Sequence, residues 1–120
     1  MKLLPVVLGL ALVPNASLAL VWNCEFPRIC DEETCGEASF EAKIIDDGEW
    51  AEIHTPLDEL AAVTLSHPDS ADLLYASPSY YGETTMVTVF ASGDARMTVH
   101  GHADGDTWSA TYIGKCAEEG

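Results

Sequence analysis

Apolar and polar side chains alternate along much of this 120-residue chain. The alternation is clean over residues 39–44, where Phe40, Ala42 and Ile44 fall on one side, and residues 86–91 are rich in β-forming side chains. Because successive side chains of a β-strand point to opposite faces, a period of two predicts half-buried strands. The sequence therefore predicts a mainly β fold.

Short turns containing glycine and aspartate separate these segments, at residues 46–49, 92–94 and 104–106. Each turn is followed by an expected return strand, over residues 50–54, 95–100 and 107–112. Glycine readily adopts the positive φ that tight hairpin turns require. Successive hairpins of this kind predict a small antiparallel meander that closes as a barrel or a sandwich.

The middle of the chain is harder to assign. Thr55-Pro56-Leu57-Asp58 resembles the start of a helix, with Thr as the N-cap and Pro at the first helical position. We expect one short helix over residues 56–64, although a strand over residues 59–65 fits the same segment. Residues 72–76 are expected to form a strand, and residues 77–82 a surface loop.

The first 19 residues have the pattern of a signal peptide. Lys2 precedes an apolar run over residues 3–13, and Ser17-Leu18-Ala19 supplies small residues for cleavage. The run is shorter than the ~20 apolar residues that span a bilayer. We therefore expect residues 1–19 to be removed. Residues 20–120 are expected to form one β-domain without a membrane anchor, periplasmic or secreted.

An even number of cysteines in an exported chain of this size predicts disulfides; they are Cys24, Cys30, Cys35 and Cys116. Four cysteines allow three connectivities. Parity favours one, because Cys24 shares a strand face with Trp22 and Phe26, and Cys116 lies on the apolar face of the last strand. A Cys24–Cys116 bridge would tie the chain ends together and stabilise the domain by ~4 kcal/mol. Cys30–Cys35 would then close a short acidic loop.

The chain is strongly acidic, with 20 Asp and Glu against 5 Lys and Arg and a formal net charge of −15. Loss of Lys2 with the signal peptide would make the charge −16. Such a charge repels nucleic acids and anionic membrane surfaces, so neither is expected as a partner. It is compatible with a cationic protein partner or with metal ions.

His100-Gly101-His102 is the best-formed candidate site in the sequence. Residues two apart on a strand point the same way, so both imidazoles are expected on the outer face and could reach one ion. Asp104, in the following turn, could add a carboxylate. Imidazole with carboxylate suits zinc or copper. An exposed strand face beside an ordinary hairpin explains the same residues without a metal, and no other cofactor is expected.

Two family resemblances follow from these residues. The pattern Trp22-x-Cys24, Cys30, Cys35 and Thr111-Tyr112-Ile113-Gly114-Lys115-Cys116 resembles small exported four-cysteine proteins of unknown function from alphaproteobacteria, which implies a cell-envelope location. The combination of small size, expected export, paired cysteines and a β-strand pattern is similar to that of the periplasmic C-type lysozyme inhibitors of the MliC/PliC kind. Those are small disulfide-bonded β-barrels whose Ser-Gly loop enters the lysozyme active site. Ser92-Gly93-Asp94-Ala95-Arg96-Met97 is the nearest match to that loop, with one extra residue and without the family's tyrosine.

No catalytic set is recognisable in the sequence. The cysteines are expected to be oxidised, which leaves no thiol nucleophile. Ser66, His67 and Asp69 are close in sequence, whereas a triad requires convergence in space. We therefore expect a non-enzymatic binding module of the cell envelope. Metal binding through His100 and His102, or lysozyme inhibition, are the alternatives.

Overall fold

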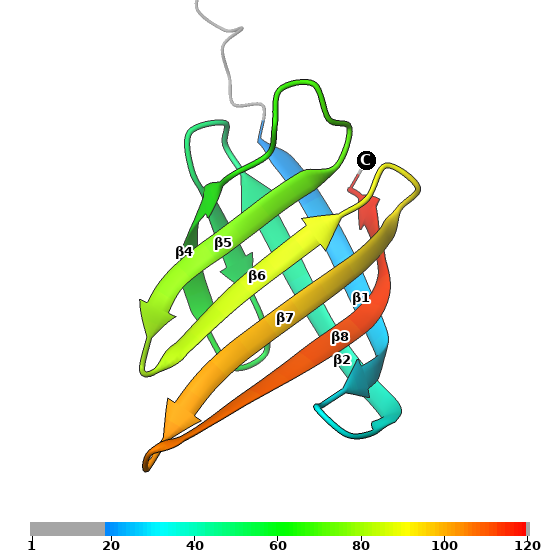
Figure 1. Cartoon of the computed structure of the whole chain (residues 1–120). Helices are drawn as coiled ribbons and strands as arrows, with labels where there is room; N and C mark the ends of the chain where they lie inside the picture. The colour runs from blue at the N-terminus through cyan, green and yellow to red at the C-terminus, as the bar shows by residue number, and fades with distance from the viewer. Residues whose placement is uncertain (1–18, 120) are drawn as a thin grey trace, which may run out of the picture.

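The structure is a computed structural model that describes residues 19–119, and within them eight strands form an antiparallel meander that closes into a barrel (Figure 1). The strands are β1 (Leu20–Cys30), β2 (Cys35–Asp46), β3 (Ala51–His54), β4 (Glu59–Thr64), β5 (Leu73–Tyr80), β6 (Glu83–Val89), β7 (Asp94–Ala103) and β8 (Asp106–Glu118). The predicted mainly β fold is confirmed, in its barrel form.

The predicted signal peptide, residues 1–19, lies outside the described residues except for its last position. Within residues 19–119 there is no helix long and apolar enough to cross a membrane.

The barrel closes where β1 pairs with β8, and the Cys24–Cys116 disulfide bridges this seam. The two cysteines are direct partners in the β1–β8 register and both side chains are buried. Cys30 and Cys35 are joined at the end of the β1–β2 hairpin. The pairing favoured by parity is therefore the one found. Disulfides of this kind persist in oxidising environments outside the cytosol.

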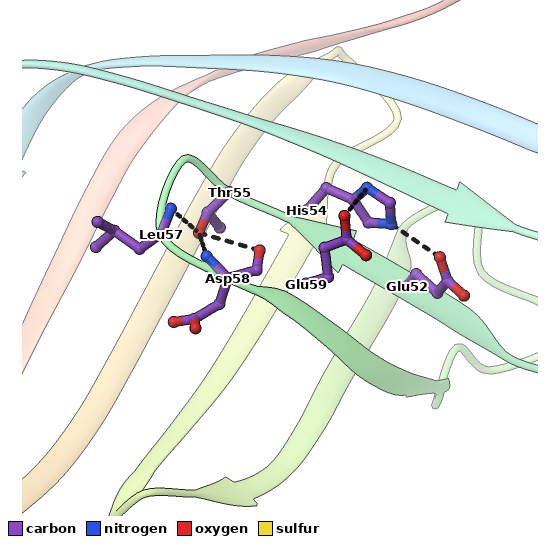
Figure 2. A network of polar contacts seen from close by, with 6 residues as sticks. All are labelled: Glu52, His54, Thr55, Leu57, Asp58 and Glu59. Atoms are coloured by element: carbon purple, nitrogen blue, oxygen red, sulfur yellow. Dashed lines mark hydrogen bonds and ion pairs between the residues drawn. The ribbon is translucent and has the colours of Figure 1, made fainter.

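The predicted helix over residues 56–64 is wrong, because this segment is a turn followed by β4. Thr55 Oγ1 accepts hydrogen bonds from the N–H groups of Leu57 and Asp58, at 3.2 and 3.1 Å, as a helix N-cap would. The Thr55 N–H, however, donates to the Asp58 carbonyl at 2.8 Å and closes a tight hairpin turn. The hydrogen bonds to Thr55 Oγ1 that would cap a helix therefore stabilise a β-turn here (Figure 2).

The loop predicted over residues 77–82 is also wrong for most of its length. Strand β5 continues to Tyr80, and only Tyr81 and Gly82, both with positive φ, form the turn into β6. The β5–β6 register shifts between Ser77 and Tyr80, around Pro78. Proline has no N–H for a ladder hydrogen bond, so the strand tolerates it at an irregularity.

The core consists of the inward side chains of the strands. The largest of those that are fully buried are Phe26, Ile44, Ile53, Tyr75, Val87 and Met97. At the end of the barrel that holds the described chain ends, the Tyr75 O–H donates to Asp46 Oδ2 at 2.8 Å. Burial and this bond to a carboxylate raise the pKa of Tyr75 well above its ordinary value of 10.0.

Gly114 lets β1 and β8 approach each other closely. The register of the two strands shifts between Glu25 and Arg28, so that Phe26 and Pro27 lie opposite Gly114 alone. A Cβ at Gly114 would collide with the backbone carbonyl of Glu25 and lie 2.8 Å from the Phe26 Cα. Only glycine fits this bulge, which bends β1 and directs the Phe26 ring into the core.

Candidate functional site

A cavity opens at the end of the barrel opposite the described chain ends, which we call the mouth. The hairpin turns at residues 31–34, 55–58, 81–82 and 104–105 lie at this end (Figure 1). The cavity has a volume of about 340 Å³. Its apolar and aromatic lining consists of Phe40, Leu57, Leu60, Tyr81, Met97, Val99, Trp108, Ala110 and Tyr112.

The cavity exists because several inward side chains near the mouth are small. Along β5 the inward residue after Tyr75 is Ser77, and along β8 the one before Tyr112 is Ala110. On β6 the inward position nearer the mouth is Thr85. A small barrel is normally filled by its own side chains, so small inward residues on neighbouring strands leave its lumen open.

Aromatic rings form one wall of the cavity. The rings of Phe40 and Tyr112 stack with centroids 4.7 Å apart at an interplanar angle of 30°. The Phe26 ring meets Tyr112 edge-on, at 6.2 Å and 62°. Both arrangements are ones that aromatic quadrupoles favour. Tyr112 is therefore held from two sides and presents a fixed ring to the lumen.

Trp108 stands at the rim over a glycine. Trp108 and Gly101 are direct partners in the β7–β8 register, and a Cβ at Gly101 would lie 2.5 Å from Trp108 Cζ2. The missing side chain leaves the space that the indole occupies. The indole remains 38% exposed, so it is accessible to a molecule entering the mouth.

Polar groups are few inside the cavity. Ser77 and Thr85 are 4% and 6% exposed. The Ser77 hydroxyl donates to the Pro78 carbonyl at 3.1 Å, whereas within residues 19–119 the Thr85 side chain forms no hydrogen bond. Among residues 19–119, Trp22 Nε1 is the one fully buried side-chain polar atom without a partner, so the Thr85 oxygen is open to the cavity, where a ligand can form a hydrogen bond with it.

Acidic side chains lie at the rim of the cavity. Asp58, from the β3–β4 turn, and Glu83, at the start of β6, both belong to the lining, and no lysine or arginine does among the described residues. In the β1–β2 turn at the same end, Asp31 Oδ1 accepts hydrogen bonds from the N–H groups of Thr34 and Glu33. These bonds lower the pKa of Asp31.

His54 lies on the outside of the barrel next to the β3–β4 turn, which Thr55 and Asp58 close (Figure 2). Its Nε2 is 2.8 Å from Glu52 Oε1, and its Nδ1 is 3.9 Å from Glu59 Oε2. When protonated, the imidazole can pair with carboxylates of both β3 and β4. Such exposed pairs contribute little to stability, but this one links the two strands that carry the Thr55–Asp58 turn.

The metal site predicted from His100, His102 and Asp104 is not assembled. The predicted orientation is found, with both imidazoles exposed on the outer face of β7. Asp104 lies beyond the strand end, at the tip of the hairpin with a φ of 52°. The two-residue period that aligns the imidazoles ends there. Among residues 19–119, no three His, Cys, Asp or Glu side chains come together in a way that could hold a metal ion.

The Ser92-Gly93-Asp94 turn lies at the end of the barrel opposite the mouth (Figure 1). The Ser92 hydroxyl donates to Asp94 Oδ2 at 3.2 Å, and the Cys116 N–H donates to the Gly93 carbonyl at 2.9 Å. The turn is thus joined to β8 next to the seam disulfide. Its likeness to the lysozyme-binding loop stays a prediction, for which a lysozyme lysis assay is the test.

Sequence reasoning did not identify the mouth cavity. A usable pattern was present, since inward positions of the later strands carry Ser77, Thr85, Gly101 and Ala110, where a filled core would have larger apolar residues. Which of these positions share a level of the barrel depends on the strand register, which parity does not give.

Comparisons with known proteins give no further guide, since no protein-family model, curated protein or solved structure matches the chain significantly.

Proposed function

We propose that the protein is a non-enzymatic binding module of an extracytoplasmic compartment, periplasmic or secreted, that takes an apolar group of its ligand into the mouth cavity. The observation that carries this proposal is a cavity of about 340 Å³ with an apolar and aromatic lining at one end of the barrel, next to its buried hydrophobic core.

The size and lining of the cavity support ligand binding. Small-molecule sites are concave, mostly apolar and typically ~300–1,000 Å³ in volume, with a few polar groups that fix orientation. This cavity lies at the lower end of that range and has the Thr85 hydroxyl inside it. It therefore suits a small ligand, or one apolar group of a larger one.

The covalent framework supports a preformed site. The Cys24–Cys116 disulfide fixes the closure of the barrel, and Cys30–Cys35 fixes the β1–β2 hairpin at the mouth. Walls that do not rearrange on binding reduce the entropy lost by the complex. The same disulfides are consistent with an oxidising compartment.

A neutral fluorescent probe tests the proposal. N-phenylnaphthylamine is expected to bind at a single site with increased emission. Val99→Trp, which fills the cavity from β7, should weaken binding by at least about tenfold. Thr98→Trp, on the outer face of the same strand, is the matched control and should bind like the parent. Circular dichroism and unfolding midpoints establish that each variant is folded.

Absence of saturable binding by the folded parent would contradict the proposal. So would equal binding by the parent and a folded Val99→Trp variant, because the probe would then lie outside the mouth.

A further inference from the structure

We infer that the ligand of the mouth cavity is an organic cation with an apolar body, of the alkylammonium class. This inference rests on the proposed function and specifies its ligand. Three features carry it, namely the charge of the rim, the aromatic wall, and the unpartnered hydroxyl inside the cavity.

The charge of the mouth is negative. Asp58 and Glu83 lie at the rim of the cavity. The turns at this end add Asp31, Glu32 and Glu33 from the β1–β2 hairpin, and Asp104 and Asp106 at the tip of the β7–β8 hairpin. Carboxylates grouped around a concave apolar site attract cations and repel anions, because low-dielectric walls concentrate the field.

Among residues 19–119, no lysine or arginine belongs to the lining of the cavity. Lys115 pairs with Asp94 at 3.7 Å and Lys43 with Glu119 at 3.7 Å, so both contact acids near the opposite end. Arg28 is exposed on β1 and is not part of the lining. A ligand with a carboxylate or sulfate head group would therefore meet Asp58 and Glu83 without a compensating cation.

The aromatic wall suits a cation that also has apolar surface. Phe40 and Tyr112 present stacked rings, and Trp108 stands over Gly101 at the rim. Cations bind over aromatic faces, best over tryptophan, and quaternary ammonium groups are recognised by several rings together. An ammonium group at the rim could contact Trp108 and the carboxylates while its alkyl part lies against Met97 and Val99.

The Thr85 hydroxyl gives the cavity one polar group to which a ligand can bind. This side chain is 6% exposed, lines the cavity and has no hydrogen-bond partner within residues 19–119. A hydroxyl can donate or accept, so it can pair with a polar atom of the ligand below the rim.

Three probes with the same octyl chain separate charge from apolar burial, namely octyltrimethylammonium and octyl sulfate below their micelle concentrations, and octanol below its solubility limit. In calorimetric titrations of the folded protein, we expect octyltrimethylammonium to bind at least about tenfold more tightly than octanol. Octyl sulfate should bind most weakly. The preference for the cation should decrease as salt screens the rim.

Two matched double variants show which carboxylates cause the preference for octyltrimethylammonium over octanol. Asp58→Asn combined with Glu83→Gln should lower the ratio of octyltrimethylammonium affinity to octanol affinity to about one. Glu49→Gln combined with Asp69→Asn changes the net charge equally in loops at the opposite end of the barrel, and should keep the preference.

The outcomes distinguish the two proposals. If octanol and octyltrimethylammonium bind equally in the mouth, or if both double variants lose the preference alike, the inferred ligand class is wrong and the proposed function stands. If none of the three probes binds the folded parent, the proposed function fails as well.

Discussion

Removing the two disulfides separately should destabilise the protein to very different extents. Cys24 and Cys116 are 92 residues apart and join the first strand to the last, whereas Cys30 and Cys35 are 5 residues apart within one hairpin. The relevant variants are Cys24→Ala with Cys116→Ala, and Cys30→Ala with Cys35→Ala. Each removes one bond and two sulfur atoms, so each serves as the control for the other.

The expected magnitudes follow from the loop lengths. In the chain-entropy model, a disulfide that closes a loop of 92 residues stabilises the fold by about 4.6 kcal/mol, and one that closes a loop of 5 residues by about 2 kcal/mol. The difference between the variants is therefore about 2.6 kcal/mol. Burial increases it further, because Cys24 and Cys116 are 2% and 6% exposed and truncating them leaves a cavity in the core.

Guanidinium unfolding under oxidising conditions measures both free energies of unfolding. The midpoint should fall much further for the Cys24/Cys116 variant than for the Cys30/Cys35 variant. The denaturant dependence should also rise more for it, because its unfolded chain expands more. Equal losses, or a larger loss for the Cys30/Cys35 variant, would refute the argument that the seam disulfide is the main covalent restraint on the barrel.

Other predictions concern single positions. Gly114→Ala should destabilise the fold by about 1–3 kcal/mol in chemical denaturation because its Cβ meets the β1 backbone, whereas Gly36→Ala, with open space around it, should be neutral or slightly stabilising. The unfolded chain ionises Tyr75 near pH 10.0 while the fold keeps it protonated. The free energy of unfolding should therefore fall above that pH, by up to about 1.4 kcal/mol per unit, and Tyr75→Phe should flatten this slope in pH-dependent unfolding; an unchanged slope would refute the assignment. Gly101→Ala should displace the Trp108 indole, seen as a shift of its N–H resonance in nuclear magnetic resonance spectra, and should weaken binding of N-phenylnaphthylamine; an unmoved resonance would contradict the packing.

Much of the fold was predictable because strand geometry has a fixed period. Alternation over residues 39–44 and glycine turns such as Asp47-Gly48 specify which side chains face inward, independently of tertiary context. The same parity placed Cys24 and Cys116 on inward faces, where the closed barrel makes them neighbours.

The helix over residues 56–64 was mispredicted because its evidence was local. A threonine whose hydroxyl oxygen accepts hydrogen bonds from the N–H groups two and three residues later, as Thr55 does, can begin a helix or close a turn. The pairing of β3 with β4 decides between a helix and a turn followed by a strand. Ala51 and Ile53 of β3 lie opposite Ala62 and Leu60 of β4, and an alternating segment buries its apolar face only as a strand.

The mouth cavity was not predictable because it depends on distances between strands that are far apart in sequence. Phe40 meets Tyr112 only through the closure of the barrel. The space beside them depends on small residues at one level of several strands, such as Ser77 and Ala110. Parity gives the face of each residue but not its height in the barrel, and the height determines which residues line a site.

The most direct test of the binding account is to locate a bound alkyl chain by nuclear magnetic resonance. With isotope-labelled protein and octanol, we expect Overhauser contacts from the octyl protons to the Met97 methyl group and the Tyr112 ring inside the mouth. Contacts confined to the outer face, for example at the exposed side chains of Val63 and Met86, would contradict it.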